Sequence, residues 1–297
     1  MRRLPLVEGL RALRPHQWAK NLLVFVPLAL TPQRLGEREL ELAALVAFVS
    51  FSLAASAGYV VNDLLDLEAD RVHPDKCRRP FASGALGRLA GIAMAAVLGV
   101  AAFGLALALT PPGFALVLAT YVGLTIAYSV YLKRLLLLDV ILLAGLYTLR
   151  VIGGAAAISI GLTPWLLAFS LFIFLSLAFA KRYSELRLMA SLREAGAKGR
   201  AYRVEDLELV AVLGATSGYL SVLVLCLYIN SDVVRQLYRT VDMLWLLCPI
   251  LLYWVSRIWF LAKRGDLPGD PVAFAVRDPV SWLSGGLMGV VIALAVI

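Results

Sequence analysis

Charged side chains are what this sequence has least of. Asp, Glu, Lys and Arg make up 16% of its 297 residues, whereas a soluble domain carries about 25%. Apolar residues make up 61%, and the mean hydropathy is +0.84. These values exclude an ordinary soluble enzyme and a disordered chain. Because one membrane-crossing helix takes about 20 apolar residues, the composition predicts an all-α, polytopic membrane protein.

Cysteine and histidine are also scarce. The three cysteines, Cys77, Cys226 and Cys248, are odd in number and share no metal-ligand spacing, so the sequence predicts neither a disulfide framework nor a zinc site. Its two histidines offer no convincing general base. The first sixteen residues contain four arginines and no continuous apolar core, so we expect no cleavable signal peptide.

Long apolar runs separated by polar or Pro/Gly breaks predict nine membrane helices in one domain over residues 1–297. The runs are continuous and lack the alternation that a membrane β-barrel needs. The expected spans are 18–31, 40–61, 86–108, 113–132, 135–157, 163–181, 207–229, 241–262 and 280–297.

Basic residues predict how the chain is oriented in the membrane. Lys and Arg number 22 in the loops on one side and four on the other, and the richer side of a membrane protein faces the cytoplasm. The N-terminus is therefore expected in the cytoplasm and, with nine spans, the C-terminus outside. The formal net charge of +8 is explained by these loops, so no nucleic-acid partner is expected.

An acidic stripe of Asn62, Asp63, Asp66 and Asp70 follows the second apolar run without a break. At about 100° per residue all four fall within one quadrant of a helix, whereas Glu68 faces away. Hard oxygen donors of this kind suit Mg²⁺ completed by substrate phosphates. The alternative is a solvated acidic helix end that pairs with the basic residues after it.

A basic turn bounded by prolines comes next. The helix is expected to end near Val72, because His73 precedes Pro74 and the residue before a proline disfavours helical geometry. We interpret His73 as a turn residue. Lys76 and Arg79, beside carboxylates that bind Mg²⁺, would form a clamp for a diphosphate.

Three further features lie in or near the fifth and sixth spans. Asp139 and Arg150 are eleven residues apart on one helix, so they face the same way, about 16 Å apart. Arg150 either faces a substrate cavity or is satisfied by groups of a neighbouring helix. The Gly153–Gly154 pair favours close helix packing over a phosphate loop. The run 181–183 (Lys-Arg-Tyr) either contacts substrate phosphates or only reflects the enrichment of basic residues at the cytoplasmic ends of membrane helices.

These residues resemble the UbiA superfamily of intramembrane prenyltransferases, whose first motif, (N/D)-x-x-x-D-x-x-x-D, is matched by Asn62, Asp66 and Asp70. Within it the chain is most similar to the branch of decaprenyl-phosphate phosphoribosyltransferases. The matching stretches are 14–21 (RPHQWAKN), 62–71 (NDLLDLEADR), 73–76 (HPDK) with Arg79-Pro80, Tyr128-Ser129 with Leu132-Lys133 and Asp139, and Lys181-Arg182-Tyr183 with Glu185.

The resemblance implies nine helices around a central cavity and a Mg²⁺-dependent transferase. A second D-x-x-x-D motif, usual in the aromatic prenyltransferases, is missing, because Leu143 stands four residues after Asp139. This favours the branch in which phosphoribosyl pyrophosphate carries the diphosphate and a polyprenyl phosphate lipid is the acceptor. The product of this branch feeds arabinose-containing cell-envelope glycans.

The expected activity is therefore transfer of 5-phosphoribosyl to a decaprenyl-type phosphate at the cytoplasmic face of a bacterial inner membrane. The alternatives are an aromatic or quinone prenyltransferase that uses a prenyl diphosphate, and a secondary transporter. The oligomeric state stays open, a homo-oligomer included. The metal ligands are expected to be Asn62, Asp66 and Asp70, and the catalytic residues Asp66, Asp70 and Asp139. The expected substrate-binding residues are Lys20, Asp63, Lys76, Arg79, Tyr128, Lys133, Arg150, Lys181, Arg182 and Tyr183.

Overall fold

A computed structural model describes residues 5–72, 76–191, 201–267 and 269–296, and this part of the chain is helical with no β-strand. Within it, eight helices are long and apolar enough to cross a membrane, which confirms the all-α, polytopic fold class. Seven of these spans are α3 (Arg38–Leu65), α5 (Arg88–Leu109), α6 (Pro112–Val130), α7 (Leu138–Ala157), α8 (Pro164–Ser191), α9 (Leu207–Ile229) and α13 (Pro279–Val296). The eighth joins η6 (Val241–Leu246) to α11 (Leu247–Arg264).

Shorter helices connect or flank these spans. They are α1 (Pro5–Leu13), η1 (Pro15–Phe25), α2 (Val26–Ala29), η2 (Pro32–Arg34), α4 (Leu67–Val72), η3 (Lys76–Arg78), η4 (Leu132–Arg134), η5 (Val204–Asp206), α10 (Asp232–Leu237) and α12 (Pro271–Ala275), where η marks a 3₁₀ helix. The end of α4 at Val72 confirms the expected end of the acidic helix. The expectation for His73 concerns a residue outside the described part.

The first predicted span, 18–31, is not a long α-helix. Residues 15–25 form the 3₁₀ helix η1, and a four-residue α-helix follows. Pro27 lacks the N–H that an α-helix through this point would need, and the polar side chains of Lys20 and Asn21 interrupt the apolar run. The prediction of nine α-helical spans is therefore wrong at this segment, and the described chain has eight.

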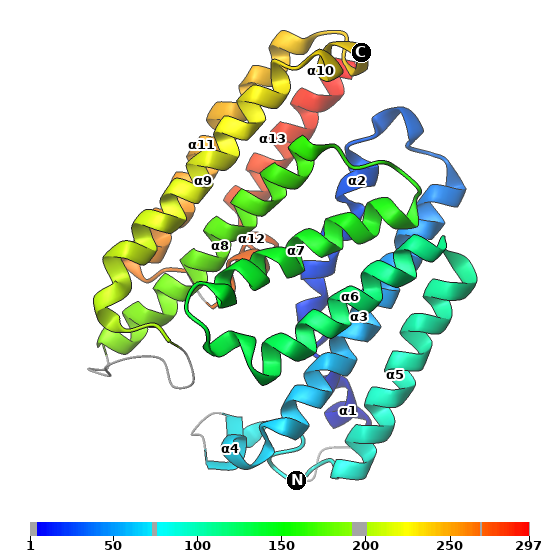
Figure 1. The fold of residues 1–297 in the computed structure, drawn as a ribbon, viewed down its shortest axis with the longest axis vertical. Helices are drawn as coiled ribbons and strands as arrows, with labels where there is room; N and C mark the ends of the chain where they lie inside the picture. The colour runs from blue at the N-terminus through cyan, green and yellow to red at the C-terminus, as the bar shows by residue number, and fades with distance from the viewer. Residues whose placement is uncertain (1–4, 73–75, 192–200, 268, 297) are drawn as a thin grey trace. The chain divides into compact units, whose positions relative to one another are not determined.

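Contacts divide the chain into two compact units, of which the first comprises residues 1–129 and 149–161. In this unit α3 packs against α5 and η1 (Figure 1). The 3₁₀ helix η1 runs antiparallel to α3. Trp18 Nε1 donates to Ser56 Oγ at 3.0 Å, and Asn21 Nδ2 donates to Ser52 Oγ at 3.0 Å. The segment thus lies along α3 although it is not α-helical.

Two glycines of α7 allow close packing within this first unit. A Cβ on Gly154 would lie 2.0 Å from the carbonyl oxygen of Val24, and one on Gly153 would lie 2.5 Å from the Phe51 ring. Both distances are far inside van der Waals contact. The interpretation of this glycine pair as a packing feature is confirmed.

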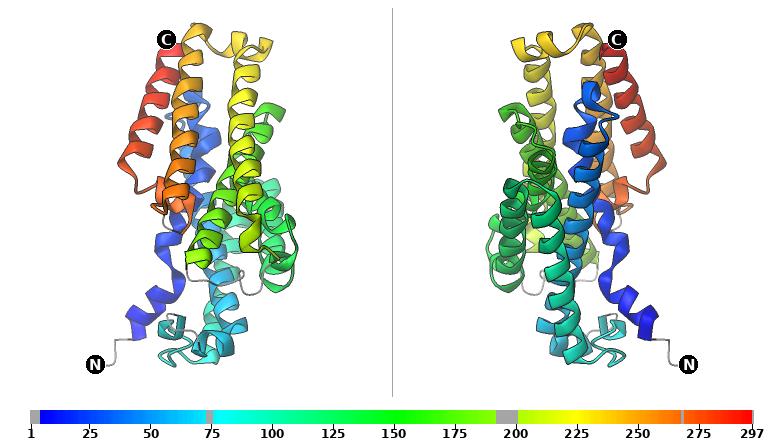
Figure 2. Two further views of the ribbon diagram at one scale, coloured as in Figure 1. Left: turned by 90° about the vertical axis from the view of Figure 1, so that its left-hand side faces the viewer. Right: turned by 90° about the vertical axis from the view of Figure 1, so that its right-hand side faces the viewer.

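The second unit comprises residues 130–148 and 162–297. Here α8 and α9 pack against each other along much of their lengths, and α11 contacts α8, α9 and α13. Figure 2 shows α9, α11 and α13 running side by side. One apolar core of this unit surrounds Val140, Phe179, Leu186 and Val210. The first half of α7 belongs to this unit and the second half to the other, and the single-domain assignment stays a prediction.

Candidate active site

The acidic stripe lies where α3 passes into α4. Asp66 stands between the two helices, yet the i to i+4 ladder continues through it: Asp66 N donates to Asn62 O at 2.9 Å, and Asp70 N donates to Asp66 O at 2.8 Å. The stripe therefore keeps helical spacing across the junction. In addition, the amide nitrogen of Asn62 donates to Asp66 Oδ2 at 3.0 Å, so two of the three expected metal ligands contact each other.

Two arginines neutralise the remaining carboxylates of the stripe. Asp63 is 2% exposed, and its Oδ1 lies 2.6 Å from Arg14 Nη2 and 3.1 Å from Arg79 Nη1. The same Arg79 nitrogen lies 2.5 Å from Asp70 Oδ2. A buried carboxylate needs such partners because desolvation is costly. Asp63, expected to bind substrate, is thus held by arginines of the N-terminal segment and of the turn after α4.

The donor set of the stripe fits Mg²⁺ in kind. In the described chain no three His, Cys, Asp or Glu side chains converge as a preformed metal centre. Asn62 and Asp66 nevertheless present amide and carboxylate oxygens, the hard ligands that Mg²⁺ prefers. Asp66 forms no recorded ion pair in this part of the chain, whereas Asp70 is held by Arg79. Asp70 would therefore join a metal only when Arg79 releases it.

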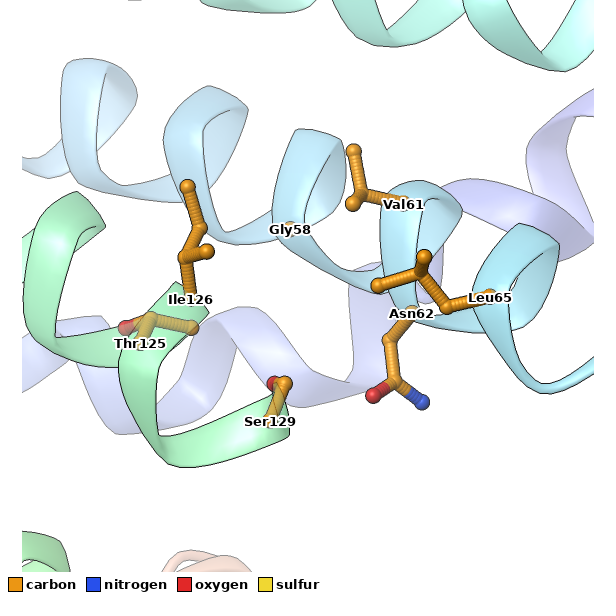
Figure 3. Close-up of a pocket in the computed structure, with 7 residues that line it drawn as sticks. All are labelled: Gly58, Val61, Asn62, Leu65, Thr125, Ile126 and Ser129. Atoms are coloured by element: carbon orange, nitrogen blue, oxygen red, sulfur yellow. The ribbon is translucent and has the colours of Figure 1, made fainter. Parts of the chain in front are cut away.

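A mostly apolar groove adjoins Asn62 between α3 and α6. It is lined by Gly58, Val61, Asn62, Leu65, Thr125, Ile126 and Ser129 (Figure 3). The amide of Asn62 lies at the end of the groove near Ser129. Thr125 Oγ1 is buried and has no hydrogen-bond partner among the described residues. The groove therefore combines an apolar lining with polar groups next to the acidic stripe.

Arg150 is satisfied at membrane depth by side chains of its own unit. It is 5% exposed; its Nε donates to Asn21 Oδ1 at 2.8 Å, and its Nη2 donates to the Tyr121 hydroxyl at 2.9 Å. The guanidinium also lies 4.8 Å from the centre of the Tyr121 ring. Of the two interpretations offered above, these contacts favour an arginine bound by neighbouring helices.

In the second unit, Asp139 and Arg182 form a fully buried ion pair. Arg182 Nη2 lies 2.6 Å from Asp139 Oδ2, and both side chains are 0% exposed. Arg182 also pairs with Glu185, and the Tyr202 hydroxyl donates to Asp139 Oδ1 at 2.9 Å. We call these four residues the Arg182 cluster. Two of its members were expected to act on substrate, and the structure shows them bound to each other.

Tyr202 completes this cluster from the loop before α9. Its hydroxyl oxygen accepts the backbone N–H of Leu137 at 3.1 Å, while the hydroxyl proton goes to Asp139. Burial, followed by the charge of Asp139 and this hydrogen bond, raises the pKa of the Tyr202 phenol. The phenol therefore stays protonated and keeps donating to Asp139 well into the alkaline range.

Lys181 and Tyr147 meet at Asp270, a residue between α11 and α12. Lys181 Nζ lies 3.4 Å from Asp270 Oδ2, and the Tyr147 hydroxyl lies 3.0 Å from the same oxygen. Asp270 Oδ1 accepts the backbone N–H groups of Val272 and Ala273, which caps α12. Asp270 thus holds the ammonium of Lys181 in one place.

The other expected site residues are spread over both units. Tyr183 packs edge-on against Trp259 at 6.0 Å between ring centres. Lys76 is exposed on η3. Lys133 is half-buried on η4, and no ion pair or hydrogen bond of its side chain is recorded within the described chain. Lys20 lies on η1 and Tyr128 on α6, both half-buried.

Sequence reasoning missed Arg14, Tyr202 and Asp270 as partners of site residues. Their contacts join positions 49, 63 and 89 residues apart. Local sequence patterns cannot predict contacts between residues so far apart in the chain. A partial signal existed for Asp270, because Asp followed by Pro271 is a typical helix start. Arg14 stood inside a matched stretch but carried no signal for its carboxylate partner.

The helical fold and its eight candidate spans define a polytopic membrane protein. The sequence profile of the UbiA prenyltransferase family matches residues 22–295. The chain belongs to this family and is an enzyme of it, which confirms the resemblance described above. Membership in a transferase family leaves the transporter alternative without support.

Three similar proteins illustrate the relationship. The uncharacterized protein y4nM of Sinorhizobium fredii is 37% identical over 98% of this chain, which spans only 56% of that protein's length. Decaprenyl-phosphate phosphoribosyltransferase of Mycobacterium tuberculosis is 36% identical over 93% of this chain and 90% of its own. A UbiA homolog from Archaeoglobus fulgidus, solved with GPP and Mg²⁺, is 14% identical with a TM-score of 0.70 over 96% of this chain and 99% of its own, and it shares the fold.

Proposed function

We propose that this protein transfers 5-phosphoribosyl from phosphoribosyl pyrophosphate to a polyprenyl phosphate of decaprenyl type and releases pyrophosphate. The similarity to the Mycobacterium tuberculosis enzyme over almost the full length of both chains supports this assignment. The observation that carries it is that Asp66 of the acidic stripe has no cationic partner among the described residues, whereas Asp139 is paired with Arg182.

The carboxylates of the acidic stripe and those of the second unit's buried pairs differ in their partners. In the first unit Asp66 has no cationic partner among the described residues. In the second unit Asp139 and Glu185 are paired with Arg182, and Asp270 is paired with Lys181. A prenyl diphosphate donor would call for a second metal-binding pair, whereas a donor whose diphosphate arrives from water needs a single carboxylate stripe and basic residues for the other phosphates.

The residues of this chain would act mainly by binding and charge neutralisation. Arg79 and Lys76 would bind the diphosphate, and Lys133, which has no ion partner among the described residues, would bind a phosphate. Asn62, Asp66 and Asp70 would hold Mg²⁺, which when bound neutralises charge on the departing pyrophosphate.

The chemical step itself requires no strong base. An oxygen of the lipid phosphate, already ionised at pH 7, forms the new bond to the anomeric carbon. The bond from that carbon to the pyrophosphate oxygen breaks, and its electron pair leaves with pyrophosphate. Asp139 would contribute by positioning Arg182, since both are buried in contact with each other.

The proposal also covers the membrane in which the enzyme acts and the use of its lipid product. The distribution of basic residues supports an N-terminus and a site on the cytoplasmic side of a bacterial inner membrane. The phosphoribosylated lipid would supply arabinose-containing envelope glycans, as the resemblance implies.

One assay separates this activity from the aromatic prenyltransferase alternative. Purified protein is given radiolabelled phosphoribosyl pyrophosphate with decaprenyl phosphate, and in parallel geranyl or farnesyl diphosphate with labelled 4-hydroxybenzoate. We expect label from the first pair in the organic phase and no product from the second. Product from the second pair alone would make the alternative correct.

A further inference from the structure

Two glycines bring α9 and α11 into close contact. A Cβ on Gly214 would lie 2.2 Å from Cζ2 of Trp259, and one on Gly218 would lie 2.5 Å from Cγ1 of Val255. The glycines are four residues apart, the spacing of a small-residue packing motif in membrane helices. Each is opposed by a large side chain of α11 that fills the space a Cβ would take.

These contacts define an antiparallel register. Gly214 of α9 faces Trp259 of α11, and Gly218, four residues later in α9, faces Val255, four residues earlier in α11. The contact of the Tyr219 hydroxyl with Ser256 Oγ at 3.2 Å agrees with this register to within two residues. Extending it by two further turns brings the C-terminal end of α9 level with the N-terminal end of α11.

Cys226 and Cys248 meet at that level. Their sulfur atoms lie 3.3 Å apart, and both cysteines are free and half-buried. Cys248, Val255 and Trp259 are spaced by seven and four residues, so they share the face of α11 that packs on α9. The sulfur contact therefore follows from the helix packing and does not depend on one flexible side chain.

The pair lies near one end of the bundle. Cys226 is in the last turn of α9, which ends at Ile229, and Cys248 is in the first turn of α11. The segment between these helices has only two basic residues, Arg235 and Arg239, and the predicted orientation places it on the non-cytoplasmic side. Disulfides persist on that side, because it is oxidising.

We infer that Cys226 and Cys248 are a reactive dithiol that closes to an interhelical disulfide by exchange with a disulfide oxidant. The thiolate of one cysteine attacks the oxidant, forms a mixed disulfide and releases one oxidant thiol. The second cysteine then attacks the mixed disulfide and releases the other. Two protons and two electrons pass to the oxidant, and the sulfurs need approach by only about 1.3 Å to reach the bond length of about 2.0 Å.

The test uses the whole protein, purified in detergent under reducing conditions. After removal of the reductant it is treated with oxidised glutathione or the azo oxidant diamide, denatured and alkylated with N-ethylmaleimide, and its intact mass is measured. We expect three alkylated cysteines before oxidation and one afterwards, with the peptides of Cys226 and Cys248 joined. The crosslink should reverse with a phosphine reductant.

Single serine variants serve as matched controls. C77S should lose both remaining thiols on oxidation, whereas C226S and C248S should form no internal crosslink and each stop at a glutathione adduct or a free thiol. Peptide mapping of the unmodified protein keeps the test independent of how any variant folds. Two alkylatable thiols remaining in oxidised C77S, or a crosslink between protein molecules in place of the internal one, would overturn the inference.

Discussion

The guanidinium of Arg79 lies 2.5 Å from the carboxylate of Asp70, an expected ligand of the metal. If Asp70 is a metal ligand as proposed, a divalent cation and Arg79 would compete for one carboxylate. Arg79 already contacts Asp63 at 3.1 Å, so it has a second carboxylate available when Asp70 is withdrawn. A substrate diphosphate would draw Arg79 away from Asp70 and so favour the metal.

This competition predicts opposite effects of Arg79→Ala on metal and substrate. Without Arg79, Mg²⁺ alone should protect the protein against thermal unfolding at a lower concentration than in the wild type. The KM for phosphoribosyl pyrophosphate should rise about 10- to 100-fold, the loss of a charge-assisted contact. Arg71→Ala, which removes an exposed arginine paired with Glu68, should change neither quantity. A weaker Mg²⁺ response of Arg79→Ala would contradict the competition.

The carboxylates of the stripe should be essential for turnover. Asp66→Asn or Asp70→Asn is expected to lower kcat by two or more orders of magnitude, because metal-assisted charge stabilisation contributes several kcal/mol. EDTA should abolish activity and Mg²⁺ should restore it. Glu68→Gln, whose side chain is 72% exposed, should be mild. Full activity of either aspartate variant would refute the metal assignment.

The buried pair of Asp139 and Arg182 should show strong coupling. Replacing either residue by Ala leaves a buried charge without its main partner, and we expect a loss of roughly 3–5 kcal/mol in unfolding free energy. The double variant should lose less than the sum of the two single losses. The comparison is unfolding in detergent monitored by circular dichroism. Glu37→Gln, in an exposed pair with Arg34, should show no measurable change, and additive losses at positions 139 and 182 would argue against coupling.

Tyr202 should make stability depend on alkaline pH. Its pKa is raised in the folded protein by burial and then by Asp139, so above pH 10 the unfolded chain binds fewer protons than the folded one. The contribution of Tyr202 is complete below about pH 10, the usual tyrosine pKa, and is lost as the pH rises further. Melting temperatures from pH 8.5 to 11 should fall more steeply for the wild type than for Tyr202→Phe. Parallel curves would contradict this assignment.

The glycines of α7 should differ sharply in how well they tolerate substitution by alanine. Gly154→Ala would place a methyl group 2.0 Å from the Val24 carbonyl oxygen, and because backbone cannot move aside easily, we expect a loss of about 3 kcal/mol or more. Gly145, on the same helix, has nothing within 4 Å of a Cβ. Gly145→Ala should be neutral or stabilising by up to about 1 kcal/mol. Thermal unfolding of the two purified variants provides the comparison.

Hydropathy and helical spacing predicted most of the fold because both are local properties. Span 207–229 coincides with α9, and the end of the acidic helix near Val72 coincides with the end of α4. The one-quadrant placement of the acidic stripe depended only on 3.6 residues per turn, and the backbone ladder through Asp66 shows that this spacing is kept.

The errors and omissions concern features that depend on distant partners. The apolar run at 18–31 was expected to be α-helical, but its form is set by Pro27 and by polar contacts with α3. The neutralisation of Asp63 by Arg14 and the binding of Lys181 by Asp270 join residues that are close only in the folded chain. The predicted roles of Asp139 and Arg182 did not anticipate that each is the other's partner.

The contacts of Asn21 have a consequence for how the membrane protein is assembled. Its carboxamide is bound by Ser52 of α3 and by Arg150 of α7, and the latter is synthesised 129 residues later. Until both helices are in the bilayer, the polar groups of η1 have no partners there, and burying them alone in lipid costs several kcal/mol. Asn21 can therefore complete its contacts only after α3 and α7 are both in place.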